Sequence, residues 1–306
     1  MKPNTDTMAL DQEFEEESEE GVEMSFLEHL EELRWNILRA VGAIFVFTIA
    51  GWIYVNDIYH YIIIAPAKTE FWTYRMMCKL GKAVGAEGLC IDKIDFELQA
   101  LGVGEQFSMA LTSSVIVGLV FAFPYAFWEI WRFIKPGLKA YERRAARGAV
   151  FYVTFLFFSG VLFGYYIVTP LALNFLANFK LDESIINEFS ISSYIGMVAT
   201  LTLACGLAFQ LPVIVFVLSR VGFLTPSVMR EYRRHAIVAI LIAAAIITPS
   251  ADIYSQILVA MPLTLLYEVS IVVSGRVQKA KAREEARLAK IYEQRMGTPG
   301  NESENE

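Results

Sequence analysis

The chain has 306 residues, of which 55% are apolar, and a formal net charge of −7. This apolar content is above the roughly 45–50% that is usual in globular proteins, and long stretches of the chain carry no ionisable side chain. A helix of a water-soluble protein needs one polar face. Composition therefore excludes a soluble fold for most of the chain, and lipid is the simpler solvent for the uncharged stretches.

The charges concentrate toward the two ends of the chain. An acidic run covers residues 11–23, and the last residues are acidic as well. Runs of this kind are usually disordered and solvated. We predict a disordered acidic cytoplasmic tail at 1–24, a transmembrane domain at 25–275 and a charged cytoplasmic tail at 276–306. The first residues lack the basic flank and apolar run of a cleavable signal peptide.

A membrane-spanning helix needs about 20 apolar residues to cross roughly 30 Å of hydrocarbon. The sequence predicts an all-α polytopic membrane protein with six such helices, the fifth of them short. Their expected positions are about 36–55, 107–131, 148–170, 192–219, 236–250 and 254–274.

The distribution of Lys and Arg predicts the orientation of these helices. One side of the predicted arrangement carries 20 of these residues and the other side 6. The basic side of a membrane protein faces the cytoplasm, so both termini are expected there. Pro124, Pro212 and Pro262 fall inside predicted spans, where neighbouring helices can satisfy the freed carbonyl groups. Bends at these prolines favour a concave bundle.

Two cysteines, Cys78 and Cys90, fall in the long outer connector between the first two spans. If the membrane is a bacterial inner membrane, this connector faces an oxidising compartment. A disulfide between the two residues and a pair of free thiols both remain open at this point.

The segment before the first span predicts an acidic helix. Ser25 followed by Glu28 fits a capping box, and Glu28 and Glu32 are then one turn apart on a shared face. Such a pair of like charges favours a cationic partner. Its other interpretation is an interfacial helix with a solvated acidic face.

Gln210 lies in the middle of the fourth predicted span. A primary amide in hydrocarbon is unfavourable unless it is hydrogen-bonded. It can bond a helix of its own bundle, or it can serve a partner helix that docks from the membrane.

The order of several motifs resembles the TatC family, the multispanning subunit of the twin-arginine (Sec-independent) protein translocase. The similar segments lie in family order between about residues 25 and 275. They are HLEELR at 29–34, AP at 65–66, FIKPGL at 133–138, YERR at 141–144, FQLP at 209–212 and TPSAD at 248–252.

This resemblance implies a receptor for signal peptides with two consecutive arginines, and a core subunit that exports folded proteins across the cytoplasmic membrane. It assigns signal-peptide binding to Glu32 and Glu142, with Glu28 adding negative potential. Arg34 and Phe133 match family positions that hold this site together. Arginine pairs bidentately with carboxylate, so two adjacent arginines need more than one acid.

The resemblance also implies roles elsewhere in the chain. Gln210 matches a family position, often Glu, associated with docking of a partner helix. Structural roles are expected for a further set of matched residues, namely Pro66, Pro136, Pro212 and Asp252.

The resemblance further implies partners and an energy source. The expected partners are single-span membrane proteins of the TatA and TatB type, twin-arginine signal peptides of folded cargo, the lipid bilayer and further copies of the chain within a larger complex. The proton-motive force is the expected energy source. No cofactor, metal or nucleic acid is expected.

Two other classes of membrane protein fit the sequence less well. A secondary transporter of a small solute usually keeps ionisable groups at the membrane midplane, whereas Glu129, Arg132 and Glu268 fall near predicted cytoplasmic span ends. An intramembrane protease would need a base at the depth of its nucleophile, and no histidine lies inside a predicted span. Neither class is favoured, and no enzymatic activity is expected.

Overall fold

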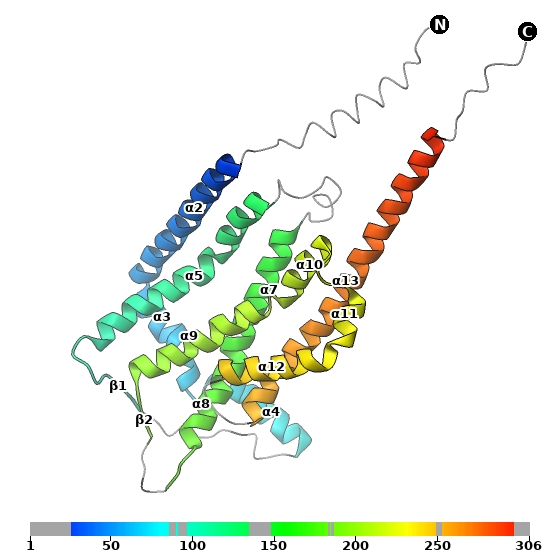
Figure 1. The fold of residues 1–306 in the computed structure, drawn as a ribbon. Helices are drawn as coiled ribbons and strands as arrows, with labels where there is room; N and C mark the ends of the chain where they lie inside the picture. The colour runs from blue at the N-terminus through cyan, green and yellow to red at the C-terminus, as the bar shows by residue number, and fades with distance from the viewer. Residues whose placement is uncertain are drawn as a thin grey trace, which may run out of the picture. The chain divides into compact units, whose positions relative to one another are not determined.

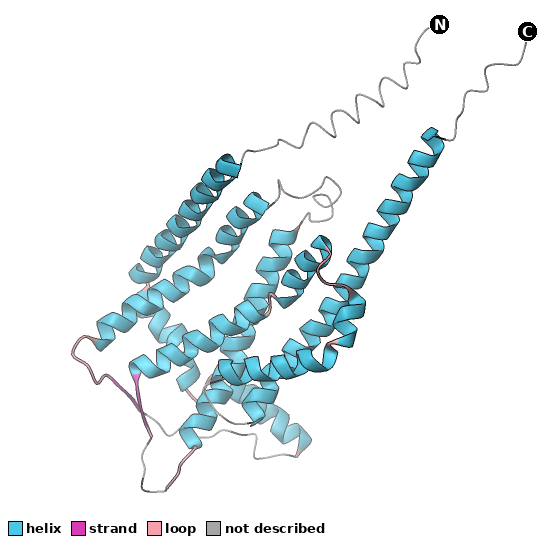
Figure 2. Ribbon diagram, viewed as in Figure 1, coloured by secondary structure: helices cyan, strands magenta, loops and turns pink. Residues whose placement is uncertain are grey.

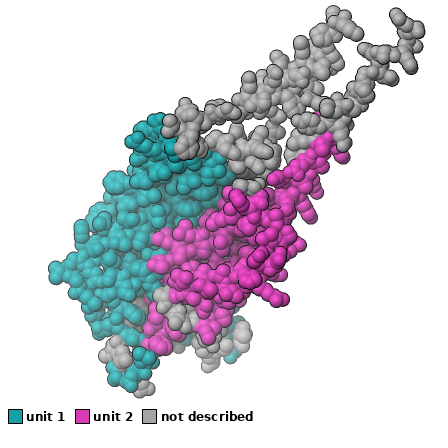
Figure 3. Space-filling model, in the orientation of Figure 1, with its two compact units in different colours: residues 1–158, 180–199 teal, residues 159–179, 200–306 magenta. Residues whose placement is uncertain are grey.

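The structure is a computed structural model of the 306-residue chain, and it describes residues 26–85, 90, 97–134, 148–182, 184, 187–248 and 253–296. Within these residues the fold is almost entirely helical, with one small sheet (Figures 1 and 2). The chain divides into two compact units, shown in Figure 3. One unit comprises residues 1–158 and 180–199, and the other comprises residues 159–179 and 200–306.

The elements follow one another along the chain in this order: α2 (Phe26–Ile53), α3 (Val55–Ile58), the π-helical turn η1 (Tyr59–Ile63), the 3₁₀ turn η2 (Ala65–Ala67), α4 (Trp72–Val84), β1 (Glu97–Gln99), α5 (Glu105–Ile134), α7 (Ala149–Phe163), the π-helical turn η5 (Gly164–Val168), α8 (Thr169–Asn178), β2 (Glu188–Ser190), α9 (Ile191–Ala208), α10 (Leu211–Val221), α11 (Pro226–Glu231), α12 (Arg233–Ile247) and α13 (Ile253–Met296).

Five helical segments of the described chain are long and apolar enough to cross a membrane. They are Leu30–Ile53, Glu105–Ile134, Ala149–Asn178, Ile191–Ser219 and Gln256–Ile291. The predicted fifth span corresponds to α12, whose 15 residues rise only about 22 Å, less than the hydrocarbon core. The polytopic helical fold is therefore confirmed, while the count of six spans and the cytoplasmic termini stay predictions.

Antiparallel packing of α2 and α5 forms the core of the first unit (Figure 1). The two helices approach closely at Gly118, where a Cβ atom would lie 2.7 Å from the backbone nitrogen of Thr48. A second close approach brings Gly51 against Ser114. Small residues allow such contacts between membrane helices. The outer faces of the pair expose large apolar side chains such as Phe45, as expected for helices in lipid.

The connector after α2 is held by buried tyrosine hydroxyl groups. Tyr74 donates a hydrogen bond to the carbonyl oxygen of Pro66 at 3.1 Å, and Tyr194 donates to that of Ile63 at 2.6 Å. Pro66 itself is buried. A proline cannot donate the helical hydrogen bond, and the chain widens into the π turn η1 just before it. The structural role expected for Pro66 stays a prediction.

The same unit contains the small sheet and its anchor. Strands β1 and β2 pair in parallel, with Leu98 opposite Phe189. Just beyond them, the Glu105 carboxylate accepts hydrogen bonds from the backbone nitrogen of Ser192 at 3.1 Å and from its hydroxyl at 2.6 Å. This carboxylate therefore ties the start of α5 to the start of α9.

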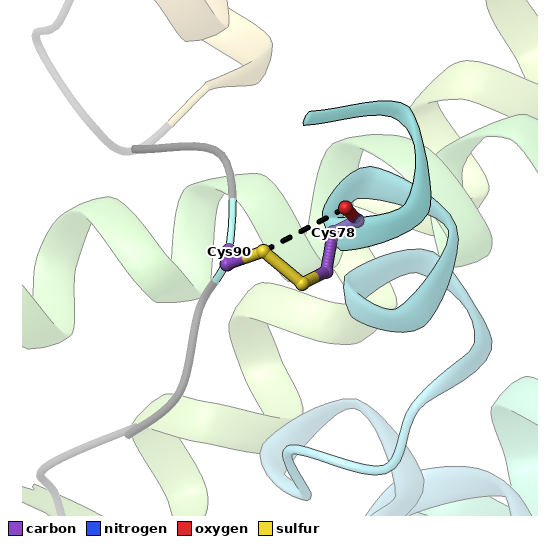
Figure 4. Close-up of a disulfide and its surroundings, with 2 residues drawn as sticks. All are labelled: Cys78 and Cys90. Atoms are coloured by element: carbon purple, nitrogen blue, oxygen red, sulfur yellow. Dashed lines mark hydrogen bonds between the residues drawn. A yellow bond between two sulfur atoms is a disulfide. The ribbon is translucent and has the colours of Figure 1, made fainter. Parts of the chain in front are cut away.

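Cys78 and Cys90 are joined by a disulfide in the structure (Figure 4). The bond connects α4 to the segment that follows it and closes a loop with a sequence separation of 12. A chain-entropy argument favours such a cross-link because it restricts the unfolded state.

In the second unit, glycines bring α7 and η5 against α9. A Cβ atom on Gly160 would lie 2.6 Å from the carbonyl oxygen of Cys205, and one on Gly164 would lie 2.9 Å from the Cα atom of Thr202. The π turn η5 directly precedes Pro170, which repeats the pattern seen before Pro66.

The remaining helices of this unit pack around a small apolar cluster. Val215 of α10, Met229 of α11 and Ile271 of α13 form its buried centre. A buried hydrogen bond of 2.8 Å joins the hydroxyls of Ser219 and Ser274. These contacts fix α10 and α11 against the first half of the long helix α13.

Candidate functional site

The acidic signature helix forms the first part of α2. Glu31 and Arg34 are exposed there, and Glu32 is half-buried. The side chain of Glu28 lies outside what the structure describes. Glu32 and Asn36 lie on one face of α2, because residues four apart share a helix face. Arg34 is about 200° around the helix from Glu32, so it does not share this face.

The close contacts of α2 and α5 define the register of the pair. Thr48 lies against Gly118, and Ser114 lies against Gly51. Continuing the antiparallel register of Gly51 and Ser114 by one residue of α5 for each residue of α2 brings Glu32 level with Phe133, and the register of Thr48 and Gly118 brings it level with the next residue, Ile134. The structure thus places these two predicted residues at the same end of the helix pair, where Phe133 is half-buried.

The same register places Asn36 level with Glu129, a carboxylate whose side chain is only 1% exposed. The Tyr125 hydroxyl donates a 2.8 Å hydrogen bond to Oε1 of Glu129. Nη1 of Arg39 approaches Oε2 of Glu129 at 3.8 Å, which is an ion pair without a hydrogen bond. We call Glu32, Asn36, Arg39, Tyr125 and Glu129 the α2–α5 polar cluster.

Three buried atoms of this cluster have no hydrogen-bond partner among the described residues. They are Oε2 of Glu32, Nδ2 of Asn36 and Oε2 of Glu129. Unpaired polar atoms that are shielded from water are unfavourable by about 1–3 kcal/mol each. Two of the three are carboxylate oxygens, so the cluster is suited chemically to a cation that carries several N–H donors.

Sequence reasoning noted Glu129 only as an acid near a span end and assigned it no role. The available signal was one acid at the end of an otherwise uncharged span, with a tyrosine four residues before it. Several predicted site residues lie outside the described residues, namely Glu142, Pro136 and Asp252.

Gln210 lies where the fourth predicted span is interrupted. Helix α9 ends at Ala208, and α10 begins at Leu211, with Pro212 in its first turn. Proline is tolerated in the first turn of a helix because the missing N–H would have no helical partner there. The half-buried Gln210 is the N-cap residue of α10, and its carbonyl oxygen accepts from the backbone nitrogen of Ile214 at 3.0 Å.

A family model described as "Sec-independent protein translocase protein (TatC)" matches residues 28–262. Proteins of that name are among the relatives. One from Blattabacterium sp. subsp. Periplaneta americana is 38% identical over 261 residues, covering 85% of this chain and 98% of the relative. One from Koribacter versatilis is 36% identical over 264 residues, covering 85% and 88%.

Solved structures give the same result. A crystal structure of the "Twin Arginine Translocase Receptor- TatC" matches with a TM-score of 0.60 at 29% identity, covering 82% of this chain and 100% of that one. A second structure, of the same receptor in DDM, matches with a TM-score of 0.63 at 30% identity, covering 81% and 99%. The family resemblance drawn from the motifs is confirmed: the chain belongs to the TatC family of the Sec-independent, twin-arginine protein translocase and is a multi-pass protein of the cell inner membrane.

Proposed function

We propose that this chain is the signal-peptide receptor of its translocase and that it binds the two consecutive arginines of a leader at the cytoplasmic end of α2 and α5. It acts as a binding and docking subunit rather than as an enzyme. The observation that carries the proposal is the half-buried Glu32, which has an unpaired buried oxygen and lies level with Phe133.

The electrostatics of this end favour a guanidinium ligand. A carboxylate that is partly shielded from water attracts a cation more strongly than a solvated one does. Glu142 follows the last described residue of α5, Ile134, by only eight positions in the sequence. We infer that Glu142 supplies a second carboxylate beside Glu32, so that each arginine of the leader meets an acid.

The comparisons support this function over transport of a small solute, since the matched family is a protein translocase. The described spans agree with that choice: the charged pair Arg39 and Glu129 lies near one end of α5, not at its middle. As further partners we propose single-span proteins of the TatA and TatB type, together with further copies of this chain in a larger complex.

Photocrosslinking of a twin-arginine precursor to the purified receptor tests the binding site. The variants Glu32→Gln and Glu142→Gln are expected to lose most of the crosslink, because each removes one guanidinium acceptor. Glu31→Gln is the matched control, since Glu31 is the neighbouring acid and is exposed. Undiminished crosslinking in the double variant Glu32→Gln/Glu142→Gln would remove both residues from the site.

We propose that the break between α9 and α10 receives a partner helix through the Gln210 amide. Gln210→Leu is then expected to reduce co-purification of the single-span partners severalfold, since a hydrogen bond between membrane helices contributes about 0.6 kcal/mol on average and up to about 1.7 kcal/mol. Thr202→Val, in the same helix pair, is the control for loss of a polar group. Unchanged co-purification of Gln210→Leu would assign the amide to the bundle itself.

A further inference from the structure

We propose that Glu129 is a third carboxylate of the leader site, paired with Arg39 in the free receptor and with an arginine of the leader in the complex. This inference rests on the proposed function and deepens it. It also assigns to Glu129 the preference for arginine over lysine at one of the two leader positions.

The state of the Glu129 carboxylate is the first argument. It is 99% buried, yet its Oε2 atom has no hydrogen bond among the described residues. Charge-assisted hydrogen bonds between nitrogen and carboxylate oxygen are about 2.7–2.9 Å long, so the 3.8 Å approach of Arg39 leaves this oxygen unsatisfied. A donor that reaches Oε2 more closely is favoured over Arg39.

The position of Arg39 is the second argument. Its side chain is 46% exposed, so it can leave the carboxylate without crossing the helix contact. Tyr125 meanwhile holds Oε1 at 2.8 Å and acts as a positioning residue that keeps Oε2 directed toward α2. The exchange replaces one guanidinium with another, and the charge balance of the cluster is kept.

The relative depth of Glu129 and Glu32 is the third argument. Glu129 lies level with Asn36, one helical turn from Glu32, which is a rise of about 6 Å. Hydrogen bonds of about 2.8 Å from opposite sides of one guanidinium bridge a gap of this size. In the proposed complex, one arginine of the leader bridges the carboxylates of Glu32 and Glu129.

Selectivity for arginine follows from this bridge. A guanidinium presents five N–H donors in a planar fork, whereas the lysine ammonium is a compact point charge. The three donors of an ammonium leave from one atom, so at about 2.8 Å for each bond a lysine spans a shorter gap between two carboxylates than a guanidinium does. A site made only of solvent-exposed acids would discriminate far less between arginine and lysine.

The test measures the affinity of the purified full-length receptor, in nanodiscs, for fluorescent synthetic leaders with Arg-Arg, Lys-Arg or Arg-Lys. Glu129→Gln is expected to weaken Arg-Arg binding roughly tenfold or more, the equivalent of one charged hydrogen bond. In the same variant, the ratio of the affinity for Arg-Arg to the affinity for the leader with lysine at one of the two positions falls toward one. This coupling is a double-mutant cycle between receptor and leader.

Arg39→Gln has the opposite expected sign. Removal of the competing guanidinium raises the affinity for Arg-Arg, while the double variant Arg39→Gln/Glu129→Gln binds as Glu129→Gln does. A purely structural ion pair predicts instead that either single change weakens binding and that the double variant, which removes both charges, restores it. The double variant also keeps the test decisive if a single variant does not fold.

Two results overturn the inference, and they differ in whether the proposed function stands. If Glu129→Gln keeps the affinity and the arginine preference of the wild type while Glu32→Gln loses binding, Glu129 has no role in the site and the proposed function stands. If Glu32→Gln also binds normally, the proposed function fails and this inference fails with it. Glu31→Gln, which is expected to bind as the wild type does, serves as the control in both cases.

Discussion

Replacing Gly118 with alanine tests whether the close approach of α2 and α5 positions the arginine site. The added Cβ atom would lie 2.7 Å from the backbone nitrogen of Thr48, where an ordinary carbon contact needs about 3.5–4.0 Å. The two helices must therefore separate by about 1 Å. Overpacking is unfavourable by about 1–3 kcal/mol, with the upper value expected here because a backbone atom cannot rotate away.

The higher helix propensity of alanine offsets about 1 kcal/mol of this effect. The expected net loss is then about 2 kcal/mol of unfolding free energy. Leader binding is expected to fall as well, because Glu32 and Glu129 lie on the two helices that move apart. Thermal unfolding of the detergent-purified protein and leader affinity in nanodiscs measure the two effects.

Gly42→Ala is the matched control, because Gly42 lies in α2 and a Cβ atom there meets no atom within 4 Å. It is expected to be neutral or more stable by up to about 1 kcal/mol. Thr48→Ala in the Gly118→Ala background is expected to rescue little, since it removes the hydroxyl and leaves the backbone contact. Should Gly118→Ala unfold and bind as Gly42→Ala does, the close approach has no part in positioning the site.

The outer connector yields two further predictions. Reduction of the denatured protein before alkylation is expected to add two labels, and equal labelling with and without reduction would contradict the disulfide. The double variant Cys78→Ser/Cys90→Ser is expected to lower the free energy of unfolding by about 3 kcal/mol for a loop of this length. Tyr194→Phe leaves the buried Ile63 carbonyl without its donor and is expected to lower the unfolding free energy by about 1–3 kcal/mol. The exposed Tyr54→Phe is its control, and equal melting temperatures for the two variants would refute the assignment.

Local sequence features predicted the polytopic helical class because its physical cause is local. An uncharged stretch of sufficient length becomes a membrane helix wherever it lies in the chain. The interruption at Gln210 and Pro212 follows from proline in the same way. The π turns before Pro66 and Pro170 were not predicted, since a widened turn and a simple bend both accommodate a proline.

The binding site was predicted in part. Glu32 and Phe133 could be named from their motifs, but the two residues are 101 positions apart in the chain, and their shared level depends on the register of α2 and α5. The packing of Gly51 on Ser114 and of Gly118 on Thr48 determines this register. Glu129 had no motif to mark it, and its importance follows from burial and from the unpaired oxygen, which are properties of the packed helix pair.

The sequence by itself determined that much of this protein lies in lipid, that its fold is helical and, through the order of its motifs, to which family it belongs. These depend on composition along the chain, because each span satisfies its own backbone hydrogen bonds. Only the tertiary structure decided which face of α2 meets α5 and which carboxylates become buried there. Burial arises between segments distant in the chain, and small residues at the contact set how deeply each side chain is enclosed.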